Sequence, residues 1–356
     1  MKKLLYIMGI EWNWIFQRPQ IFALELQKDY EVTVVCPKQL LQREQKENIP
    51  PEHLTELVQI PFQEKSRLIG FFADKLHRHV LRDISAYDLI FVGYPLFGRY
   101  IPKDYKGTVI YDCMDNFEAL YPDRRKKAID YVLTMEKQLL QRADIVLASS
   151  QKLKDKLLKI CPDKKIELIR NGYSNIEVKQ PQQAMQKDVY TLGYIGTISE
   201  WFDNDVVEES LKVNEKIRYD MVGPIAKHQV IDNPKVMYSG VVEHERLSEY
   251  VNRIDCLIMP FVISDIVLYV DPVKLYEYIA WGKCIVASWY PEIDRFEDYV
   301  YFYRDRQEYM QLMEGLTKKG FPPKYTQNKQ KAFLKENTWD VRIKAVKEVI
   351  KSREKA

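Results

Sequence analysis

Two aspartates lie close together at the end of an apolar run that begins at Val109. Asp112 and Asp115 are separated by two residues, and the run before them is typical of a buried strand. A carboxylate at this place could accept a proton from an attacking hydroxyl group, which is general-base chemistry. One of the two could instead cap the following turn through backbone amides. The pair is a candidate for catalysis or for substrate contact.

A second candidate site is the start of a predicted helix near residue 271. Asp271 is a good N-cap, Pro272 a good first helical residue, and Gly282 marks the end. The free amides of the first turn, with Lys274 beside them, would bind a diphosphate. Glu277 lies about one turn after Lys274 and could accept hydrogen bonds from ribose hydroxyls. The residues expected at this site are Asp271, Val273, Lys274, Leu275 and Glu277.

Two small-residue turns follow predicted strands in the second half of the chain. The first carries Gly196, where the backbone could approach a phosphate, with Thr197 and Ser199 as hydrogen-bond donors. The second carries Gly223. The third glycine and the downstream acid of a dinucleotide fingerprint are missing, so the sequence does not indicate NAD.

The loop after the first predicted strand, residues 9–18, carries two tryptophans and an arginine. Trp12 and Trp14 offer aromatic faces that could stack on a sugar ring, and Arg18 could pair with an anion. Aromatic packing beneath the loop is an equally good interpretation. These three residues are candidates for ligand binding.

Short apolar runs alternate with longer helix-period segments, which indicates βαβ units around parallel sheets. In the first half, strands are expected at 3–8, 31–36, 57–60, 88–92, 108–111, 144–148 and 166–169. After a polar stretch the pattern restarts, with strands expected at 191–195, 219–222, 236–238, 256–259 and 284–287. Two Rossmann-like sheets follow, and ligands of such sheets bind at the carboxyl ends of the strands.

The length of 356 residues is about twice that of a typical domain, which favours two cores. We expect a first Rossmann-like domain over 1–172, a linker over 173–188, a second domain over 189–336 and a C-terminal helix over 337–356. That last helix carries Trp339, Ile343, Val346 and Ile350 on one face.

Composition excludes several classes of protein. Lys and Arg number 54 against 51 Asp and Glu, and the basic excess lies at the C-terminus, so nucleic-acid binding is not indicated. Five scattered cysteines indicate neither a disulfide framework nor a zinc site. The apolar run at the start ends at Glu11, and no segment approaches the roughly 20 apolar residues of a membrane span. We expect a reduced, cytoplasmic protein.

Residues 272–278 (PVKLYEY) and 280–286 (AWGKCIV) resemble the donor-binding motif of GT-B glycosyltransferases, in particular the group resembling family 4. Residues 136–139, 142–146 and 149–150 resemble the strand before the linker in that group, residues 171–172 its crossover, and residues 193–196 the opening of its second domain. Residues 12–20 and 111–115 look closest to bacterial teichuronic acid biosynthesis glycosyltransferases. These matches cover nearly the whole length in the right order.

The resemblance implies a GT-B fold, in which two Rossmann-like domains face each other across a cleft and the last helix crosses back onto the first domain. It implies that the second domain binds a nucleotide-sugar donor and the first a saccharide acceptor, without a metal or other cofactor. Glu277 would then bind the donor ribose, and Lys274 and the Gly196 turn the diphosphate. The acceptor would contact the tryptophans and the arginine of the 9–18 loop.

The chain departs from the family pattern in two places. Tyr269 stands eight positions before Glu277, where the family commonly carries an acid, and residues 199–201 replace an Arg and a Lys. The diphosphate must therefore be stabilised by helix amides and Lys274, by Arg18, or not at all.

The stereochemical outcome is open at this point. If the anomeric configuration is inverted, a base is needed, and Asp115 is preferred to Asp112. If it is retained, the leaving diphosphate can help to deprotonate the acceptor, and both aspartates would hold the acceptor in place.

The stretch 65–82 is basic and amphipathic. It could rest on an anionic membrane leaflet, or form a helix that packs Leu68, Phe72, Leu76 and His79 inward. Because surface-polysaccharide assembly uses lipid-linked acceptors, we expect weak peripheral contact with the inner face of the cell membrane.

Two other functions compete with a glycosyltransferase of bacterial surface polysaccharide. A nucleotide-sugar epimerase would need a compact set of His and Glu side chains, which the loops lack. A catalytically silent GT-B-like scaffold or activator of a transferase is favoured by Tyr269 and the missing basic pair. The retained Lys274 and Glu277 argue against it.

Overall fold

The computed structural model describes residues 1–39, 48–60, 67–120, 126–173, 176–243 and 246–354. The chain divides into two compact units, which are treated separately below. Unit 1 comprises Met1–Arg170 and Arg342–Ala356, and unit 2 comprises Asn171–Val341. The described part of segment 173–188, which was expected to be a linker, therefore groups with unit 2.

Unit 1 contains a parallel sheet with the strand order β3-β2-β1-β4-β5-β6-β7 within the described residues. The strands are β1 (Lys3–Ile7), β2 (Glu31–Gln39), β3 (His53–Gln59), β4 (Leu89–Val92), β5 (Thr108–Cys113), β6 (Ile145–Ala148) and β7 (Ile166–Leu168). β4 and β6 are buried along their whole length, which is why they read as unbroken apolar runs. The seven strands expected from the sequence are confirmed.

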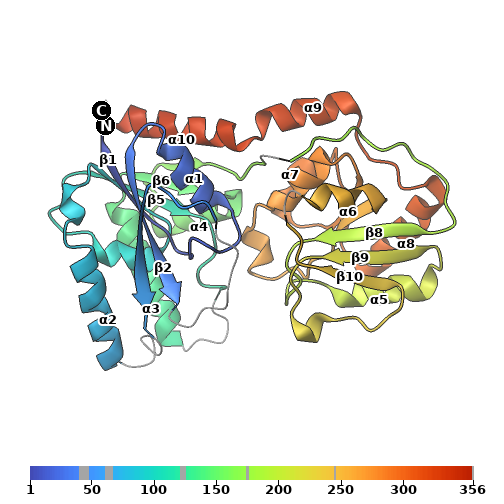
Figure 1. Ribbon diagram of the computed structural model, residues 1–356, viewed down its shortest axis with the longest axis horizontal. Helices are drawn as coiled ribbons and strands as arrows, with labels where there is room; N and C mark the ends of the chain where they lie inside the picture. Colours follow the sequence, from blue (N-terminus) through green and yellow to red (C-terminus); the bar gives the residue numbers. More distant parts are fainter. Residues whose placement is uncertain (40–47, 61–66, 121–125, 174–175, 244–245, 355–356) are drawn as a thin grey trace. The chain divides into compact units, whose positions relative to one another are not determined.

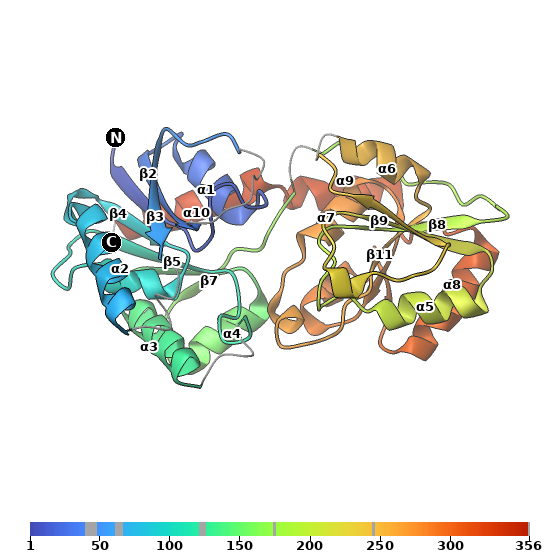
Figure 2. The same cartoon turned by 60° about the horizontal axis from the view of Figure 1, so that its bottom comes forward.

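The helices of unit 1 flank this sheet. They are α1 (Arg18–Leu26), α2 (Arg67–Val80), α3 (Lys126–Arg142), α4 (Gln151–Ile160) and most of α10 (Trp339–Glu354). α1 and α10 lie side by side, and Lys347 of α10 forms an ion pair of 2.5 Å with Asp29, just after α1 (Figure 2). The apolar face predicted for α10 is buried at Trp339, Ile343, Val346 and Ile350.

Unit 2 repeats the same topology. Its parallel sheet has the order β10-β9-β8-β11-β12-β13 in the described part of the chain. The strands are β8 (Tyr190–Ile195), β9 (Ile217–Val222), β10 (Val236–Gly240), β11 (Cys256–Met259), β12 (Cys284–Ser288) and β13 (Tyr301–Tyr303). The five strands expected from the sequence are confirmed, and β13 is an addition that the sequence analysis did not predict.

The helices of unit 2 cover both faces of its sheet. They are α5 (Asn204–Val213), α6 (Leu247–Arg253), α7 (Val273–Ala280), α8 (Arg306–Lys319) and α9 (Gln327–Glu336). Figure 1 shows α6 and α7 on one side of the sheet and α5 and α8 on the other. No helix in the described ranges has the length and apolar composition needed to cross a bilayer.

Each sheet has the strand order of a Rossmann-like fold, in which the direction of winding reverses beside the first strand. In unit 1 the reversal lies between β1 and β4, and in unit 2 between β8 and β11. The loops that leave the carboxyl ends of these strands are therefore the places to look for ligand sites.

Candidate functional site

The end of β5 in unit 1 brings Asp112 onto the side chain of Arg18, the first residue of α1. The Arg18 Nε donates to Asp112 Oδ2 at 2.8 Å and its Nη2 to Asp112 Oδ1 at 2.7 Å. Both side chains are buried, at 4% and 0% exposure. A planar guanidinium and a carboxylate in this arrangement form a bidentate ion pair.

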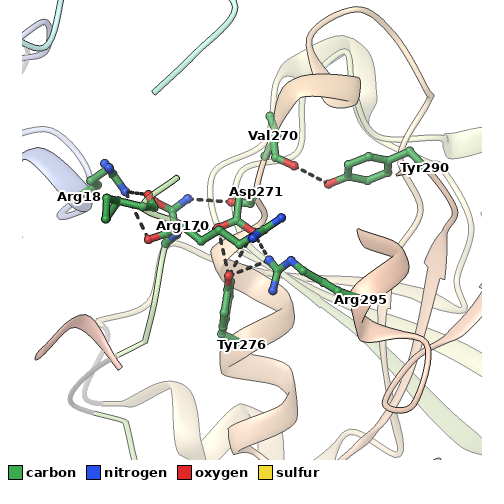
Figure 3. A network of polar contacts seen from close by, with 9 residues as sticks. Arg18, Arg170, Val270, Asp271, Tyr276, Tyr290 and Arg295 are labelled. Atoms are coloured by element: carbon green, nitrogen blue, oxygen red, sulfur yellow. Dashed lines mark hydrogen bonds and ion pairs between the residues drawn. The ribbon is translucent and has the colours of Figure 1, made fainter. Parts of the chain in front are cut away.

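The remaining donors of Arg18 are directed at the chain that leaves β7. Its Nη1 donates to the carbonyl oxygens of Ile169, at 2.6 Å, and Arg170, at 3.3 Å (Figure 3). The guanidinium also lies over the Phe22 ring, 4.4 Å from its centroid. Arg18 was expected to bind an anion of the acceptor. In the structure its guanidinium is instead buried and paired with Asp112.

Asp115, two residues after β5, is partly buried. The pKa of the Asp115 carboxyl is raised to about 6, first by burial and second by the negative charge of Asp112, against the opposing charge of Arg18. A carboxyl with this pKa is deprotonated at neutral pH and remains basic enough to take a proton. Of the two predicted catalytic aspartates, Asp115 is therefore the one whose environment suits a general base, while Asp112 is engaged by Arg18.

The two tryptophans of the 9–18 loop have different surroundings. Trp12 is 2% exposed, and its Nε1 donates to the carbonyl oxygen of Ile49 at 3.1 Å, so it packs beneath the loop. Trp14 is 48% exposed. Of the two interpretations of this loop, packing beneath it holds for Trp12, so the assignment of Trp12 to ligand binding is wrong, while Trp14 stays accessible.

In unit 2, two glycine turns at the carboxyl ends of β8 and β9 pack against each other. Gly196 has φ +143° and Gly223 has φ +134°. A Cβ on Gly223 would lie 2.3 Å from the carbonyl oxygen of Gly196, so only glycine fits. Gly196 is partly buried and has no side chain to shield its backbone.

Lys274, in the first turn of α7, lies directly over Gly196. A Cβ on Gly196 would be 2.3 Å from Lys274 Cε and 2.7 Å from its Nζ. The ammonium is 5.7 Å from the centroid of the Tyr194 ring, and the Tyr194 hydroxyl donates to the Thr197 carbonyl oxygen at 3.0 Å. The Gly196 turn and Lys274 thus lie together in the structure, as predicted, although they are 78 residues apart in the chain.

Of the other predicted donor-site residues, four are partly buried and one, Leu275, lies in the core. Glu277 and Val273 are partly buried on α7, and Thr197 is partly buried in the turn after β8. The Ser199 hydroxyl donates to the carboxylate of Glu200. Leu275 is fully buried and its amide donates to the Pro272 carbonyl oxygen at 3.2 Å, so it belongs to the core and not to a ligand site.

Asp271 does not cap α7, which begins at Val273 with Pro272 as its N-cap. Instead its carboxylate accepts from the Asn171 amide at 2.6 Å, from the Tyr276 hydroxyl at 3.0 Å and from Arg295 (Figure 3). The side chain of Asp271 is 0% exposed. The prediction of a ligand-binding cap is corrected to a buried carboxylate that fixes the start of α7.

Two partners in these sites are missed by sequence reasoning. Arg295, which pairs with Asp271, comes from the 3-10 helix Pro291–Phe296, and nothing in the local sequence marks it as a partner. Tyr194, beneath Lys274, reads as an ordinary strand residue. Among the described residues, no three His, Cys, Asp or Glu side chains lie close enough to hold a metal ion.

Comparison with known proteins agrees with this geometry. Residues 22–174 match the model of Glycosyltransferase Family 4. The chain is 26% identical over 317 residues to the putative teichuronic acid biosynthesis glycosyltransferase TuaH of Bacillus subtilis (strain 168), covering 79% of this chain and 78% of the relative.

Solved structures share the fold across the chain. Sucrose-phosphate synthase from Thermosynechococcus elongatus superimposes with a TM-score of 0.73 at 14% identity, covering 99% of both chains. Anabaena Alr3699/HepE, in complex with UDP and glucose, has a TM-score of 0.70 at 15% identity, covering 99% of this chain and 100% of the other. The chain has the GT-B fold and is similar to glycosyltransferases, with residues 22–174 resembling family 4.

Proposed function

We propose that the protein transfers a sugar from a nucleoside-diphosphate sugar, bound by unit 2, to a saccharide acceptor bound by unit 1. We further propose that the product is part of a bacterial cell-surface polysaccharide. The observation that carries the donor assignment is the ammonium of Lys274 lying against the backbone of Gly196. A cation beside a glycine turn and a helix N-terminus is an arrangement suited to a diphosphate.

The donor chemistry follows from these groups. As the bond between sugar and diphosphate breaks, negative charge grows on the leaving diphosphate, and Lys274 with the first-turn amides of α7 would stabilise it. Glu277, one turn further along α7, would accept hydrogen bonds from the ribose. We propose that no metal ion is required. The HepE structure with UDP and glucose supports a nucleotide-sugar donor for proteins of this fold.

On the acceptor side, Asp115 would remove the proton from the attacking hydroxyl in an inverting reaction. In a retaining reaction the same carboxylate would orient the acceptor. Trp14 offers an exposed ring for stacking against a sugar. The name of the Bacillus subtilis relative supports a saccharide acceptor of the cell envelope, and we propose a lipid-linked one, reached by a cytoplasmic protein at the inner face of the membrane.

The donor assignment is tested by the thermal stabilisation of the purified protein with UDP, GDP, dTDP and CMP. A ligand that binds the folded state raises its stability in proportion to the logarithm of its concentration above the dissociation constant. One nucleotide should stabilise the protein equally in magnesium and in EDTA. The shift should be lost in Lys274→Met and Glu277→Ala and kept in Lys212→Met, an exposed lysine of α5.

Absence of a shift with every nucleotide would contradict the donor site and favour a scaffold that has lost the donor. A shift that needs magnesium would contradict metal independence alone. Turnover is then measured as the release of nucleoside diphosphate in the presence of lipid-linked saccharides from envelope extracts.

A further inference from the structure

Helix α2 presents its apolar side chains to solvent. Five large apolar residues of this helix are well exposed: Leu68 at 67%, Phe71 at 62%, Phe72 at 58%, Leu76 at 43% and Val80 at 40%. Most of them are spaced four apart along the helix, so they form a continuous stripe on one side. The alternative in which Leu68, Phe72, Leu76 and His79 pack inward is therefore wrong, since the structure exposes all four.

The opposite side of α2 is fixed to unit 1 by polar contacts. The buried His77 donates from Nε2 to the Val58 carbonyl oxygen at 3.0 Å, and its Nδ1 lies 3.1 Å from the Tyr100 hydroxyl. Asp74 pairs with Arg99 at 3.0 Å. Turning the helix to bury its apolar stripe would break these contacts, so the outward direction of the stripe is built into the fold.

Cations flank the apolar stripe. Lys75, Arg78 and Arg82 are exposed on α2 and the turn after it. Arg78 pairs with Asp74 at 3.0 Å and Arg82 with Asp83 at 3.3 Å, and Lys75 has no ion pair among the described residues. Residues 65 and 66, which begin the basic stretch predicted from the sequence, lie outside the described residues. An apolar stripe with basic residues along its edge is the pattern of a helix that lies in the surface of an anionic bilayer.

We propose that this surface of α2, comprising Leu68, Phe71, Phe72, Lys75, Leu76 and Val80, docks the protein onto an anionic lipid bilayer. The apolar side chains enter the boundary between headgroups and acyl chains, while the cations contact lipid phosphates. This inference rests on the proposed function in one respect: a lipid-linked acceptor would be reached at a membrane. α2 packs beside the edge strand β3 (Figure 2).

Charge and size both favour a bilayer over a second copy of the chain. Two copies meeting through α2 would place Lys75 and its basic neighbours against one another, and like charges repel. A stripe on one 14-residue helix is also narrow compared with the roughly 800 Å² per partner of a stable protein interface. A bilayer accepts a single helix and supplies the opposite charge.

The test is flotation of the full-length protein with vesicles of phosphatidylglycerol and phosphatidylcholine, and with vesicles of phosphatidylcholine alone. We expect binding to the anionic vesicles at low salt that weakens at about 0.5 M salt, because ions screen the headgroups. Phe72→Ser and Lys75→Glu should each lower the partition coefficient about tenfold or more.

Two matched variants serve as controls for these changes. Val213→Ser alters an apolar residue of unit 2 that is 70% exposed, and Lys344→Glu reverses an exposed charge on the basic helix α10. Both should bind vesicles like the wild type. All four variants should retain the nucleotide-induced thermal shift, which keeps failure of docking separate from failure of the donor site.

Three results overturn the proposal: no flotation of the wild type at low salt, equal loss in Lys344→Glu and Lys75→Glu, or full binding by Phe72→Ser. A concentration-dependent dimer by light scattering that becomes monomeric in Phe72→Ser would identify a second copy as the occupant instead.

Discussion

Arg18 and Asp112 form a buried bidentate ion pair although they are 94 residues apart in the chain. The pair joins the first residue of α1 to the end of β5, just before the loop that carries Asp115. The same guanidinium donates a hydrogen bond to the carbonyl oxygen of Ile169. Three segments of unit 1 are thus fixed at one point. The charge of Asp112 also raises the pKa of the neighbouring Asp115 carboxyl.

Replacing one partner of this pair should destabilise unit 1 strongly. Asp112→Asn leaves the buried Arg18 charge without compensation, and such a loss costs about 3–5 kcal/mol of the free energy of unfolding. Arg18→Lys should cost a similar amount, because an ammonium cannot make the two parallel bonds. Urea unfolding measures both. The double variant Arg18→Met/Asp112→Leu should recover part of the loss, and single variants within about 1 kcal/mol of wild type would contradict the structural role.

Transfer activity should depend on the ionisation of Asp115. If Asp115 is the base, kcat/KM should fall as the pH drops below about 6, because the carboxyl becomes protonated there. Asp115→Asn should lower kcat by about a hundredfold or more and remove this acidic limb. A profile that keeps the limb in Asp115→Asn would assign the ionisation to another group.

The same pKa shift has a consequence for stability that does not require activity. Folding raises the pKa of Asp115 above its unfolded value of about 3.9. The folded state therefore holds the proton more tightly, and the ionised carboxylate destabilises it increasingly as the pH rises from about 4 to about 6. Asp115→Asn should raise the melting temperature at a pH of about 7, and the increase should be much smaller at a pH of about 4. Asp104→Asn, at an exposed position, should do neither.

Gly196 should tolerate no side chain. Gly196→Ala places a Cβ in a backbone region with φ +143° and against Lys274, so we expect nucleotide affinity to fall by at least tenfold. Gly315→Ala is the matched control, because it lies within α8 and a Cβ there meets nothing within 4 Å. The control should stabilise the protein by about 0.5–1 kcal/mol and leave binding unchanged. Equal nucleotide affinity in both variants, measured by calorimetry, would argue against the turn as a phosphate site.

Much of the fold is predictable because its strands are short, apolar and separated by turn residues. β11 and β12 are buried throughout, so periodicity and β-branched composition identify them without any partner. The apolar face of α10 is likewise readable from the spacing of Ile343, Val346 and Ile350. β13 was not predicted, because its three residues are all aromatic, only Tyr303 is buried, and the run lacks the aliphatic residues of the other strands.

The sites are less predictable, because residue type fixes what a side chain can do and only the fold fixes what it contacts. Lys274 and Gly196 meet as expected, since a helix N-terminus and a glycine turn both lie at the carboxyl edge of one sheet. Asp271 and Arg18 also carry charge in the predicted places. Arg295 lies 24 residues from Asp271 and Asp112 lies 94 residues from Arg18, so the sequence cannot show that these charges are already paired.

Asp271 should behave as a structural residue when it is changed. Asp271→Asn keeps one acceptor oxygen for the Asn171 backbone amide and the Tyr276 hydroxyl, and replaces the charged oxygen that faces Arg295 with an NH2 group. We expect a loss of about 2 kcal/mol in the free energy of unfolding, because the Arg295 side chain is still partly exposed to water. The nucleotide-induced thermal shift should survive. A variant of wild-type stability that no longer binds nucleotide would return Asp271 to the donor site.

Variants of Trp12 and Trp14 should have different effects, on stability for Trp12 and on acceptor binding for Trp14. Trp12→Ala removes a ring that is 2% exposed, so it should lower the free energy of unfolding by about 3–5 kcal/mol. Trp14→Ala removes a ring that is 48% exposed, and its effect on stability should stay within about 0.5 kcal/mol. If Trp14 stacks on the acceptor, its loss should raise the KM for acceptor by about tenfold without changing nucleotide affinity. An unchanged acceptor KM in a stable Trp14→Ala protein would move the acceptor site away from the loop after β1, since Trp12 is already buried beneath it.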